Sequence, residues 1–227
     1  MIPLLSAEAR ERRAVLRNAK EIIRRLSVDI GERTVRRHES LEHARHYIAD
    51  YFAEHGVNPV EERYEAGGRT VSNIIAEIPG AEIPDSIILV GAHYDTVEGT
   101  PGADDNASGI AGLLEMFRLL SGSRCKRTAR FVAFTLEEPP FFSTELMGSM
   151  VNAKNARSRN DRIELMVCLE MLGYAARRCH QDYPMNHKKK EFPACGNYIS
   201  VISLPSSAEY VYLWRNVYNA RARHKIY

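Results

Sequence analysis

The chain has 227 residues, of which 44% are hydrophobic, so it is long enough to bury one substantial core. Its 31 basic and 29 acidic residues leave a net charge of +2, which gives no electrostatic attraction to nucleic acid or to an anionic membrane surface. No window approaches the roughly 18 consecutive apolar residues of a membrane span, and no export-type apolar segment is visible. We therefore expect a globular protein with no nucleic-acid or membrane partner, located in the cytoplasm; the oligomeric state stays open.

The four cysteines are widely spaced, and none falls in a C-x-x-C pair. This spacing argues against a thiolate zinc knot or a redox pair and favours free thiols. Cys179 and Cys195 are the pair that would form a disulfide if the chain were exported.

Two helices are predicted at the start of the chain. The first runs from Ala7 to Leu26, because hydrophobic residues recur there at helical spacing. These residues are Val15, Leu16, Ala19, Ile22, Ile23 and Leu26. Ser40 is the predicted N-cap of the second helix, and Gly56 ends it. Residues 1–38 form a predicted helical appendage.

The next segments have the composition of strands. Residues 60–64 and 71–78 surround Gly67-Gly68, which predicts an antiparallel pair at the edge of a sheet. A further apolar run, residues 87–90, leads to His93, and a helix is expected from Ala107.

The strand pattern returns at residues 131–136, which completes a β-loop-α-β unit typical of a parallel sheet covered by helices. The predicted fold class is α/β, with a mixed, mostly parallel central sheet flanked by helices. Later elements are a short helix, a buried strand, an exposed basic loop, a strand and a closing helix. Their predicted ranges are 147–156, 163–169, 175–196, 197–202 and 208–222.

Three of the predicted strands are followed by side chains that bind metal ions. His93 ends the first, Glu137-Glu138 follow the second, and Glu170 follows the third. Ligands of open α/β sheets bind outside the carboxyl ends of the strands, so these side chains are expected to meet at one edge. Imidazole and carboxylate are ligands that zinc accepts, which predicts a zinc site.

Several neighbours suit such a site. Asp95 lies two residues beyond His93, on the same side of an extended segment, and could accept a hydrogen bond from the imidazole. One member of the Asp104-Asp105 pair, in a glycine-rich turn before a helix, is a candidate to bridge two cations. Of Glu137 and Glu138, one could bind metal while the other transfers a proton.

The chain resembles the di-zinc aminopeptidases, family 28 of the metallopeptidases, over roughly residues 40–173. The similarity is carried by four segments in the order and approximate spacing of that family. They are Gly91-Ala92-His93-Tyr94-Asp95, Pro101 to Gly109, Glu137-Glu138 and Leu169-Glu170-Met171.

The resemblance implies four metal ligands: His93, Asp105, Glu138 and Glu170. Asp105 would bridge two zinc ions, with His93 and Glu170 on the first and Glu138 on the second. Glu137 would be the general base, Asp95 would orient His93, and both are the catalytic candidates. The implied fold is that of the zinc aminopeptidases, in a single peptidase-like domain over residues 1–227. The implied activity is hydrolysis of N-terminal peptide bonds, with peptides as substrates.

One expected ligand is missing. The family places a further histidine on the second zinc, in a Ser-Asp-His-like segment after the last strand–helix unit. His180 and His187 come too early, and His224 lacks those surroundings, so the C-terminal part of the fold is expected to be missing. Two zinc ions are implied by the family, but this chain is expected to hold as few as one.

Three functions remain open from the sequence. The first is a metallo-aminopeptidase whose activity is impaired by the absent histidine. The second is a zinc-binding homologue without catalysis, and the third is a glutaminyl-cyclase-like acyl transferase. The preferred substrate side chain cannot be read from the sequence.

Overall fold

The structure, a computed structural model, describes residues 6–176 and 195–220. The chain divides into two compact units, Met1–Gly173 and Tyr174–Tyr227. All the candidate site residues lie in the first unit. Within the described ranges, no helix combines the length and the apolar character needed to span a bilayer.

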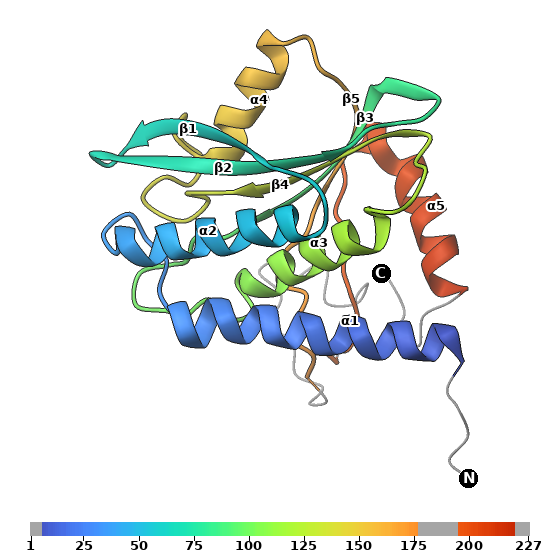
Figure 1. Cartoon of the computed structure of the whole chain (residues 1–227), viewed down its shortest axis with the longest axis horizontal. Helices are drawn as coiled ribbons and strands as arrows, with labels where there is room; N and C mark the ends of the chain where they lie inside the picture. The colour runs from blue at the N-terminus through green and yellow to red at the C-terminus, as the bar shows by residue number, and fades with distance from the viewer. Residues whose placement is uncertain (1–5, 177–194, 221–227) are drawn as a thin grey trace. The chain divides into compact units, whose positions relative to one another are not determined.

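The first unit is built on a five-stranded sheet (Figure 1). Its strands are β1 (Val60–Ala66), β2 (Arg69–Ile78), β3 (Ile83–His93), β4 (Arg127–Phe134) and β5 (Arg162–Cys168). Their order in the sheet is β1-β2-β4-β3-β5. The pairs β1/β2 and β2/β4 are antiparallel, whereas β3 pairs in parallel with both β4 and β5. The predicted mixed sheet and its antiparallel edge pair are confirmed.

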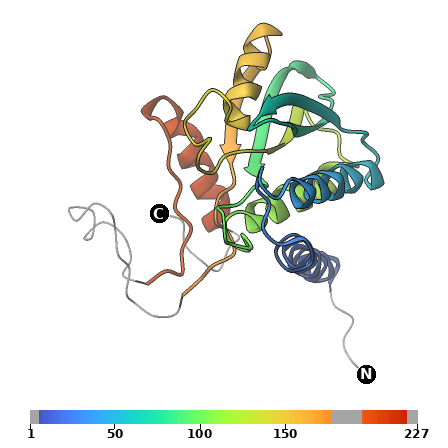
Figure 2. The ribbon, with the colours of Figure 1, turned by 90° about the vertical axis from the view of Figure 1, so that its left-hand side faces the viewer.

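Helices cover both faces of this sheet, as the two views in Figures 1 and 2 show. On one face lie α2 (His38–Glu54) and α3 (Ala107–Leu120), and α1 (Ala7–Arg24) packs against α3 as an outer layer. On the opposite face lies α4 (Gly148–Ser158), which contacts β2. The predicted α/β class, a sheet flanked by helices, is therefore confirmed.

The core lies between the sheet and its two inner helices. The ring of Phe117 on α3 contacts Phe52 of α2 and Phe131 of β4 edge-to-face, with centroids 4.7 and 5.3 Å apart. All three side chains are fully buried. This core fixes α3, whose first turn follows the glycine-rich loop, against the strands that carry the candidate ligands.

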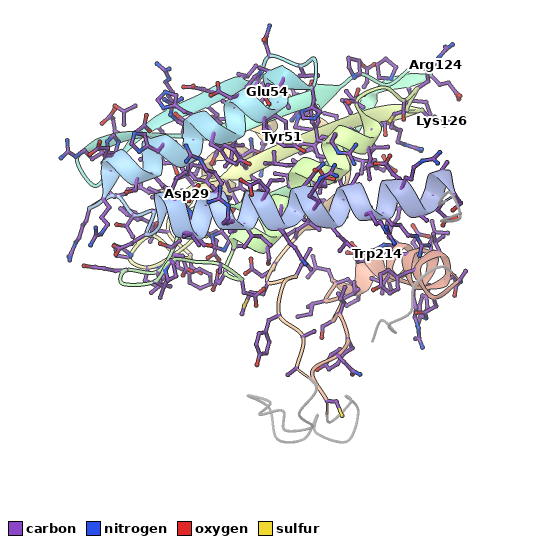
Figure 3. The ribbon with its side chains drawn as sticks, turned by 60° about the horizontal axis from the view of Figure 1, so that its bottom comes forward. Asp29, Tyr51, Glu54, Arg124, Lys126 and Trp214 are labelled. Carbon is purple, nitrogen blue, oxygen red and sulfur yellow. The ribbon has the colours of Figure 1, made fainter. Side chains whose placement is uncertain are left out.

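The first helix is attached to this core through a shared carboxylate. Glu115 of α3 accepts hydrogen bonds from Asn18 of α1, Tyr51 of α2 and Arg118. Tyr51 is labelled in Figure 3. Because α1 is an outer layer, only a narrow stripe of it is covered. Leu16, although it belongs to the hydrophobic residues that recur at helical spacing, is accordingly 62% exposed.

Two further sequence predictions need correction in the first unit. Ser40 is not an N-cap, because α2 already begins at His38, after a turn in which Thr34 Oγ1 accepts the N–H of Arg37. The strand predicted at 163–169 is present as β5, but most of its residues are exposed. The reason is that, among the described strands, β5 lies at the edge of the sheet and pairs only with β3.

The second unit contains a short 3₁₀ turn, η3 (Pro205–Ser207), and α5 (Ala208–Asn219). The strand predicted at 197–202 is reduced to a single bridge residue, because no described strand pairs along it and Ile202 is 94% exposed. The prediction of four free thiols is wrong at Cys195, which is disulfide-bonded, whereas Cys125 and Cys168 are free. The predicted basic loop 175–196 lies mostly outside the described residues, as do His180, His187 and His224.

Candidate metal centre

The three parallel strands deliver their following residues to one edge of the sheet. His93 is the last residue of β3, and Glu137 and Glu138 follow the end of β4. Pairing of β5 with β3 continues through the N–H of Leu169, which donates to the carbonyl of Gly91 at 2.8 Å, so that Glu170 comes next at the same edge. The edge is the one at which open α/β sheets bind ligands.

The predicted ligands meet around the imidazole of His93. Its Nε2 lies 3.2 Å from Oδ1 of Asp105, 3.4 Å from Oε2 of Glu170 and 3.8 Å from Oε2 of Glu137. Two sets of potential ligand atoms lie within 4.8 Å of one another in the described part of the chain. One contains His93, Asp105 and Glu170, and the other contains His93, Glu137 and Glu138.

This arrangement fits a divalent metal better than a hydrogen-bonded cluster. Oδ1 of Asp105 is buried and accepts no hydrogen bond, although His93 Nε2 is only 3.2 Å away. A buried carboxylate oxygen without a hydrogen bond is costly unless a cation satisfies it. One imidazole nitrogen with several carboxylate oxygens is a donor set that zinc accepts. Asp105 therefore fits as a ligand on the geometry of this chain alone.

Asp95 holds two neighbouring segments of the centre together. Its Oδ1 accepts the backbone N–H of Glu137 and its Oδ2 that of Glu138, both at 3.0 Å. Oδ1 also lies 3.4 Å from Nδ1 of His93, but that nitrogen has no partner in hydrogen-bond geometry. The grip on the two backbone amides was not predicted, because a main-chain donor leaves no signature in the sequence.

Asn106 is a site residue that the sequence analysis missed. Its Nδ2 donates to the carbonyl of Leu169 at 2.9 Å and to Oε2 of Glu170 at 3.0 Å. Its Oδ1 accepts the N–H of Gly109 at 2.9 Å, as an N-cap of α3 does. An asparagine directly before an apolar helical pattern was the available signal. Asn106 thus fixes both the start of α3 and the carboxylate of Glu170.

Asp104, the other aspartate of the pair, binds backbone and hydroxyl groups outside the two ligand sets. Oδ1 of Asp104 accepts the N–H of Gly173 at 2.7 Å and the hydroxyl of Ser108 at 3.1 Å. Asp104 belongs to neither ligand set. It ties the segment after β5 to the first turn of α3, which leaves Asp105 as the candidate for the bridging position.

Gly109 allows the close approach of these segments. A Cβ atom at this position would lie 2.2 Å from Oδ1 of Asn106 and 2.5 Å from the carbonyl oxygen of Leu169. We expect Gly109→Ala to lower the free energy of unfolding by about 1–3 kcal/mol, since both contacts are with buried atoms that cannot move freely. Urea denaturation of the metal-free protein measures this change.

The matched control is Gly112→Ala, one turn further along the same helix. Its Cβ would meet only the side-chain end of Leu169, at 3.3 Å, and that of Leu172, at 3.4 Å. Alanine also has the higher helix propensity, so this variant is expected to be neutral or up to about 1 kcal/mol more stable. Equal destabilisation by both substitutions would contradict the close-approach argument.

Charge within the centre shifts the pKa values of its groups. Burial would lower the pKa of His93, but the close carboxylates of Asp105, Asp95 and Glu170 outweigh it and raise the pKa to about 12. Burial and the negative charge of Asp105 raise the pKa of Glu138 to about 7. Burial also raises the pKa of Glu137. The metal-free centre therefore holds a proton on His93 at neutral pH.

This proton predicts the pH dependence of metal binding. A ligand must be deprotonated to bind, so protons compete with the metal and the competition weakens as the pH rises. We expect zinc affinity to rise about tenfold per pH unit from about pH 7 to about pH 8, and more steeply below pH 7, where Glu138 must also release a proton. Zinc titrations against a chromophoric chelator at several pH values measure the slope, and a flat profile would contradict the assignment of His93.

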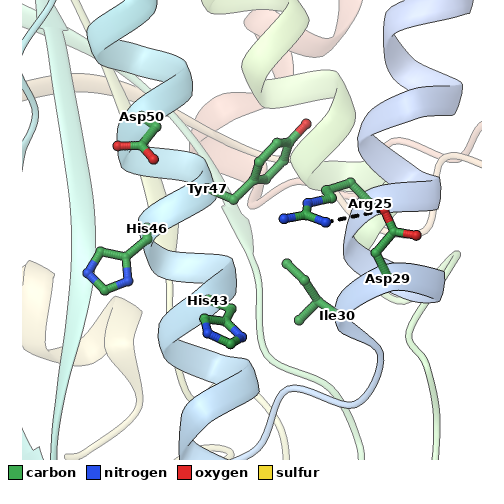
Figure 4. A pocket seen from close by; sticks show the side chains of 7 residues that line it. All are labelled: Arg25, Asp29, Ile30, His43, His46, Tyr47 and Asp50. Atoms are coloured by element: carbon green, nitrogen blue, oxygen red, sulfur yellow. Dashed lines mark hydrogen bonds and ion pairs between the residues drawn. The ribbon is translucent and has the colours of Figure 1, made fainter.

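A concavity in the first unit lies away from these residues. It has a volume of about 350 Å³ and lies between α2 and η1 (Arg25–Ile30), the π-helical turn that follows α1. Figure 4 shows its lining, which includes His43, His46 and Asp50. None of these belongs to a convergent ligand set of the described residues. The metal-binding chemistry is thus concentrated at His93.

Comparison with known proteins agrees with this fold and site. The sequence pattern of peptidase family M28 matches residues 73–210. The uncharacterised protein YfbL of Escherichia coli is 35% identical over 192 residues, which cover 81% of this chain and 58% of YfbL. A probable zinc metalloprotease of Pyrenophora tritici-repentis is 32% identical over 111 residues, which cover 45% of this chain and 24% of that protein.

Solved structures show the same fold at low sequence identity. The LapA aminopeptidase of Legionella pneumophila superposes with a TM-score of 0.69 at 16% identity, covering 100% of this chain and 58% of LapA. A glutaminyl cyclase of Tannerella forsythia superposes with a TM-score of 0.67 at 21% identity, covering 93% of this chain and 76% of that protein.

Fold and site together define an α/β protein with an acidic centre, built around one imidazole, that suits a divalent metal. The chain belongs to peptidase family M28. The family resemblance inferred from the sequence motifs and the zinc-aminopeptidase-like fold are confirmed. The chain spans 58% of the length of YfbL, and a smaller share of the metalloprotease.

Proposed function

We propose that this chain supplies the catalytic centre of a zinc-dependent peptidase that hydrolyses N-terminal peptide bonds. The observation that carries the proposal is the convergence of His93, Asp105 and Glu170, with an Asp105 oxygen that accepts no hydrogen bond. Relatives and structural neighbours described as a zinc metalloprotease and an aminopeptidase support the same activity.

Five side chains have proposed roles at the metal. His93, Asp105 and Glu170 would hold one zinc ion, and Asp105 with Glu138 would hold a second. No described histidine besides His93 is available to the second position, so we propose that this chain by itself binds one zinc more tightly than the other. When bound, zinc polarises a carbonyl oxygen and lowers the pKa of water.

Glu137 has the proposed role of general base. Burial raises its pKa, which favours uptake of a proton by this carboxylate. It would accept a proton from the attacking water and transfer it to the amine of the leaving residue. Its backbone N–H is held by Asp95, which keeps the carboxylate beside the ligands.

The surplus of acidic groups suits a substrate with a free amine. Glu137, Glu138, Asp105 and Glu170 surround a single imidazole, so the centre carries net negative charge even with one divalent ion bound. A protonated amino terminus of a peptide would be attracted to these carboxylates, whereas an acetylated one would not. We therefore propose peptides with a free amino terminus as the substrate class.

The proposal is tested with the full chain loaded with zinc or cobalt. Short peptides with free amino termini are expected to release their first residue, while N-acetylated copies of the same peptides stay intact. Peptides that begin with glutamine separate the acyl-transfer alternative, because cyclisation releases ammonia without chain cleavage. A folded, metal-loaded chain that neither cleaves nor cyclises any of these peptides would refute catalysis and leave a metal-binding homologue.

A further inference from the structure

A fully buried arginine, Arg33, contacts the loop that runs from His93 to Asp105. It is 0% exposed and follows η1 in the chain. Its guanidinium donates hydrogen bonds of 2.6 to 3.1 Å to five backbone carbonyl groups. These acceptors belong to Leu26, Gly31, Tyr94, Pro101 and Gly102.

The backbone of Arg33 binds the same loop at Thr96. Its N–H donates to Oγ1 of Thr96 at 3.0 Å, and its carbonyl accepts the N–H of Thr96 at 3.1 Å. With the bonds to Tyr94 and Gly102, Arg33 therefore binds the loop both near its start and near its end. The loop contains no helix or strand of its own. Its other hydrogen bonds include those of Asp95 with the amides of Glu137 and Glu138, and that of Asp104 with Gly173.

The loop is shaped to admit the guanidinium. Gly102 has a φ of +58°, and a Cβ atom there would lie 2.8 Å from Nη2 of Arg33 and 2.3 Å from Cγ2 of Thr96. Only glycine combines this backbone conformation with this closeness at low cost. Gly102 then leads, through Asp104, directly to Asp105.

The charge of Arg33 has no hydrogen-bonded carboxylate among the described residues. By contrast, the buried Arg130 pairs with Glu77 and Asp161. Burial lowers the pKa of Arg33 to about 10, and the nearby charges of Asp95 and Asp105 oppose this decrease. The side chain therefore stays charged at neutral pH. Burying such a charge is costly, and an apolar side chain of similar size would fill the space without that cost.

What an apolar side chain cannot do is bind five carbonyl groups at once. We propose that Arg33 is a positioning residue, which holds the loop 94–102 in the one path that places Asp105 opposite His93 for a shared metal ion. This inference rests on the proposed function. A loop without regular structure has many accessible conformations, and fixing one of them in advance removes that ordering cost from metal binding.

The test uses Arg33→Met and Arg33→Lys in the full chain, with zinc alone as the first probe. Both variants are expected to bind zinc at least about tenfold more weakly in competition with a chromophoric chelator, as for other groups that orient metal ligands. The visible absorption spectrum of bound cobalt is expected to change, because it reports the geometry of the ligands. In peptide hydrolysis, kcat is expected to fall more than KM rises.

Arg130→Met is the matched control, because it removes another buried arginine of the same unit that lies outside the centre. It is expected to lower the unfolding temperature while keeping wild-type zinc affinity and cobalt spectrum. If Arg33→Met likewise lowers only the unfolding temperature and leaves zinc affinity and the cobalt spectrum unchanged, Arg33 merely stabilises the fold and the inference is overturned. Equal loss of zinc affinity in Arg130→Met would overturn it too.

A milder variant decides the question if the Arg33 variants do not fold. Thr96→Val keeps the volume of the side chain but removes the Oγ1 that accepts the Arg33 N–H. Weaker zinc binding and an altered cobalt spectrum would support the positioning role, and wild-type values would overturn it. Failure of the proposed function is seen separately, since in that case the zinc-loaded wild-type chain itself would leave the peptides uncleaved.

Discussion

Replacing Glu137 with glutamine is expected to remove peptide hydrolysis while leaving zinc bound. Glutamine has the same shape as glutamate but cannot accept a proton from water, so the loss reports proton transfer. General bases contribute roughly 10²–10⁴-fold to catalysis, and we expect kcat to fall by that factor with little change in KM. The backbone N–H of residue 137 still donates to Asp95, which preserves the loop. Steady-state kinetics and metal analysis of the purified variant measure both effects.

The control for this prediction is Glu145→Gln, further along the loop that follows β4. The side chain of Glu145 is 83% exposed and pairs with Lys154 on α4, outside the centre. Its removal is expected to leave kcat unchanged. One result would change the assignment of Glu137: a large loss of zinc affinity in Glu137→Gln would place this carboxylate among the ligands, in the set it forms with His93 and Glu138.

Replacing His93 with alanine is expected to abolish tight zinc binding, because both convergent ligand sets contain this imidazole. In the wild-type chain, zinc at a hundred times its dissociation constant should stabilise the fold by about 2.7 kcal/mol. For a chain of this size, that corresponds to an increase of about 5–10 °C in the unfolding temperature. The variant is expected to show no zinc-dependent increase.

Each protein is compared with and without zinc, because the substitution itself also changes stability. Without the imidazolium, Asp95, Asp105 and Glu170 lose the partner that balances their charges. His43→Ala is the control, since His43 is exposed on α2 and belongs to neither ligand set. It is expected to keep the full zinc-dependent stabilisation. The same loss in His43→Ala would show that the stabilising zinc binds elsewhere.

The strands and their terminal acids could be predicted from the sequence, because burial and chemistry change abruptly there. An apolar run predicts a core strand. A histidine or a pair of glutamates directly after it, such as His93 or Glu137-Glu138, predicts a functional site, because such polar side chains are costly to bury in an apolar core. The order of these segments then suffices to bring them to one edge of the sheet. For the same reason α3 was predictable from its apolar spacing.

The supporting contacts could not be predicted, because their partners are mostly backbone groups. Arg33 binds carbonyl oxygens from segments far apart in the chain, and a carbonyl group is present at every residue. Asp95 binds two amides of the next strand's loop for the same reason. The exposure of β5 was not predicted, because an apolar run indicates a strand but does not show whether one or two other strands pair with it.

At the turn after β4, the hydrogen bonds of Asp95 hold the backbone, whereas the proposed chemistry belongs to the side chains. The aspartate recognises the main chain of residues 137 and 138, and either side chain could be exchanged without loosening that attachment. The backbone of this turn therefore keeps its position whichever side chains residues 137 and 138 carry. A protein with this architecture could lose or alter its chemistry through a single substitution there and still keep its shape.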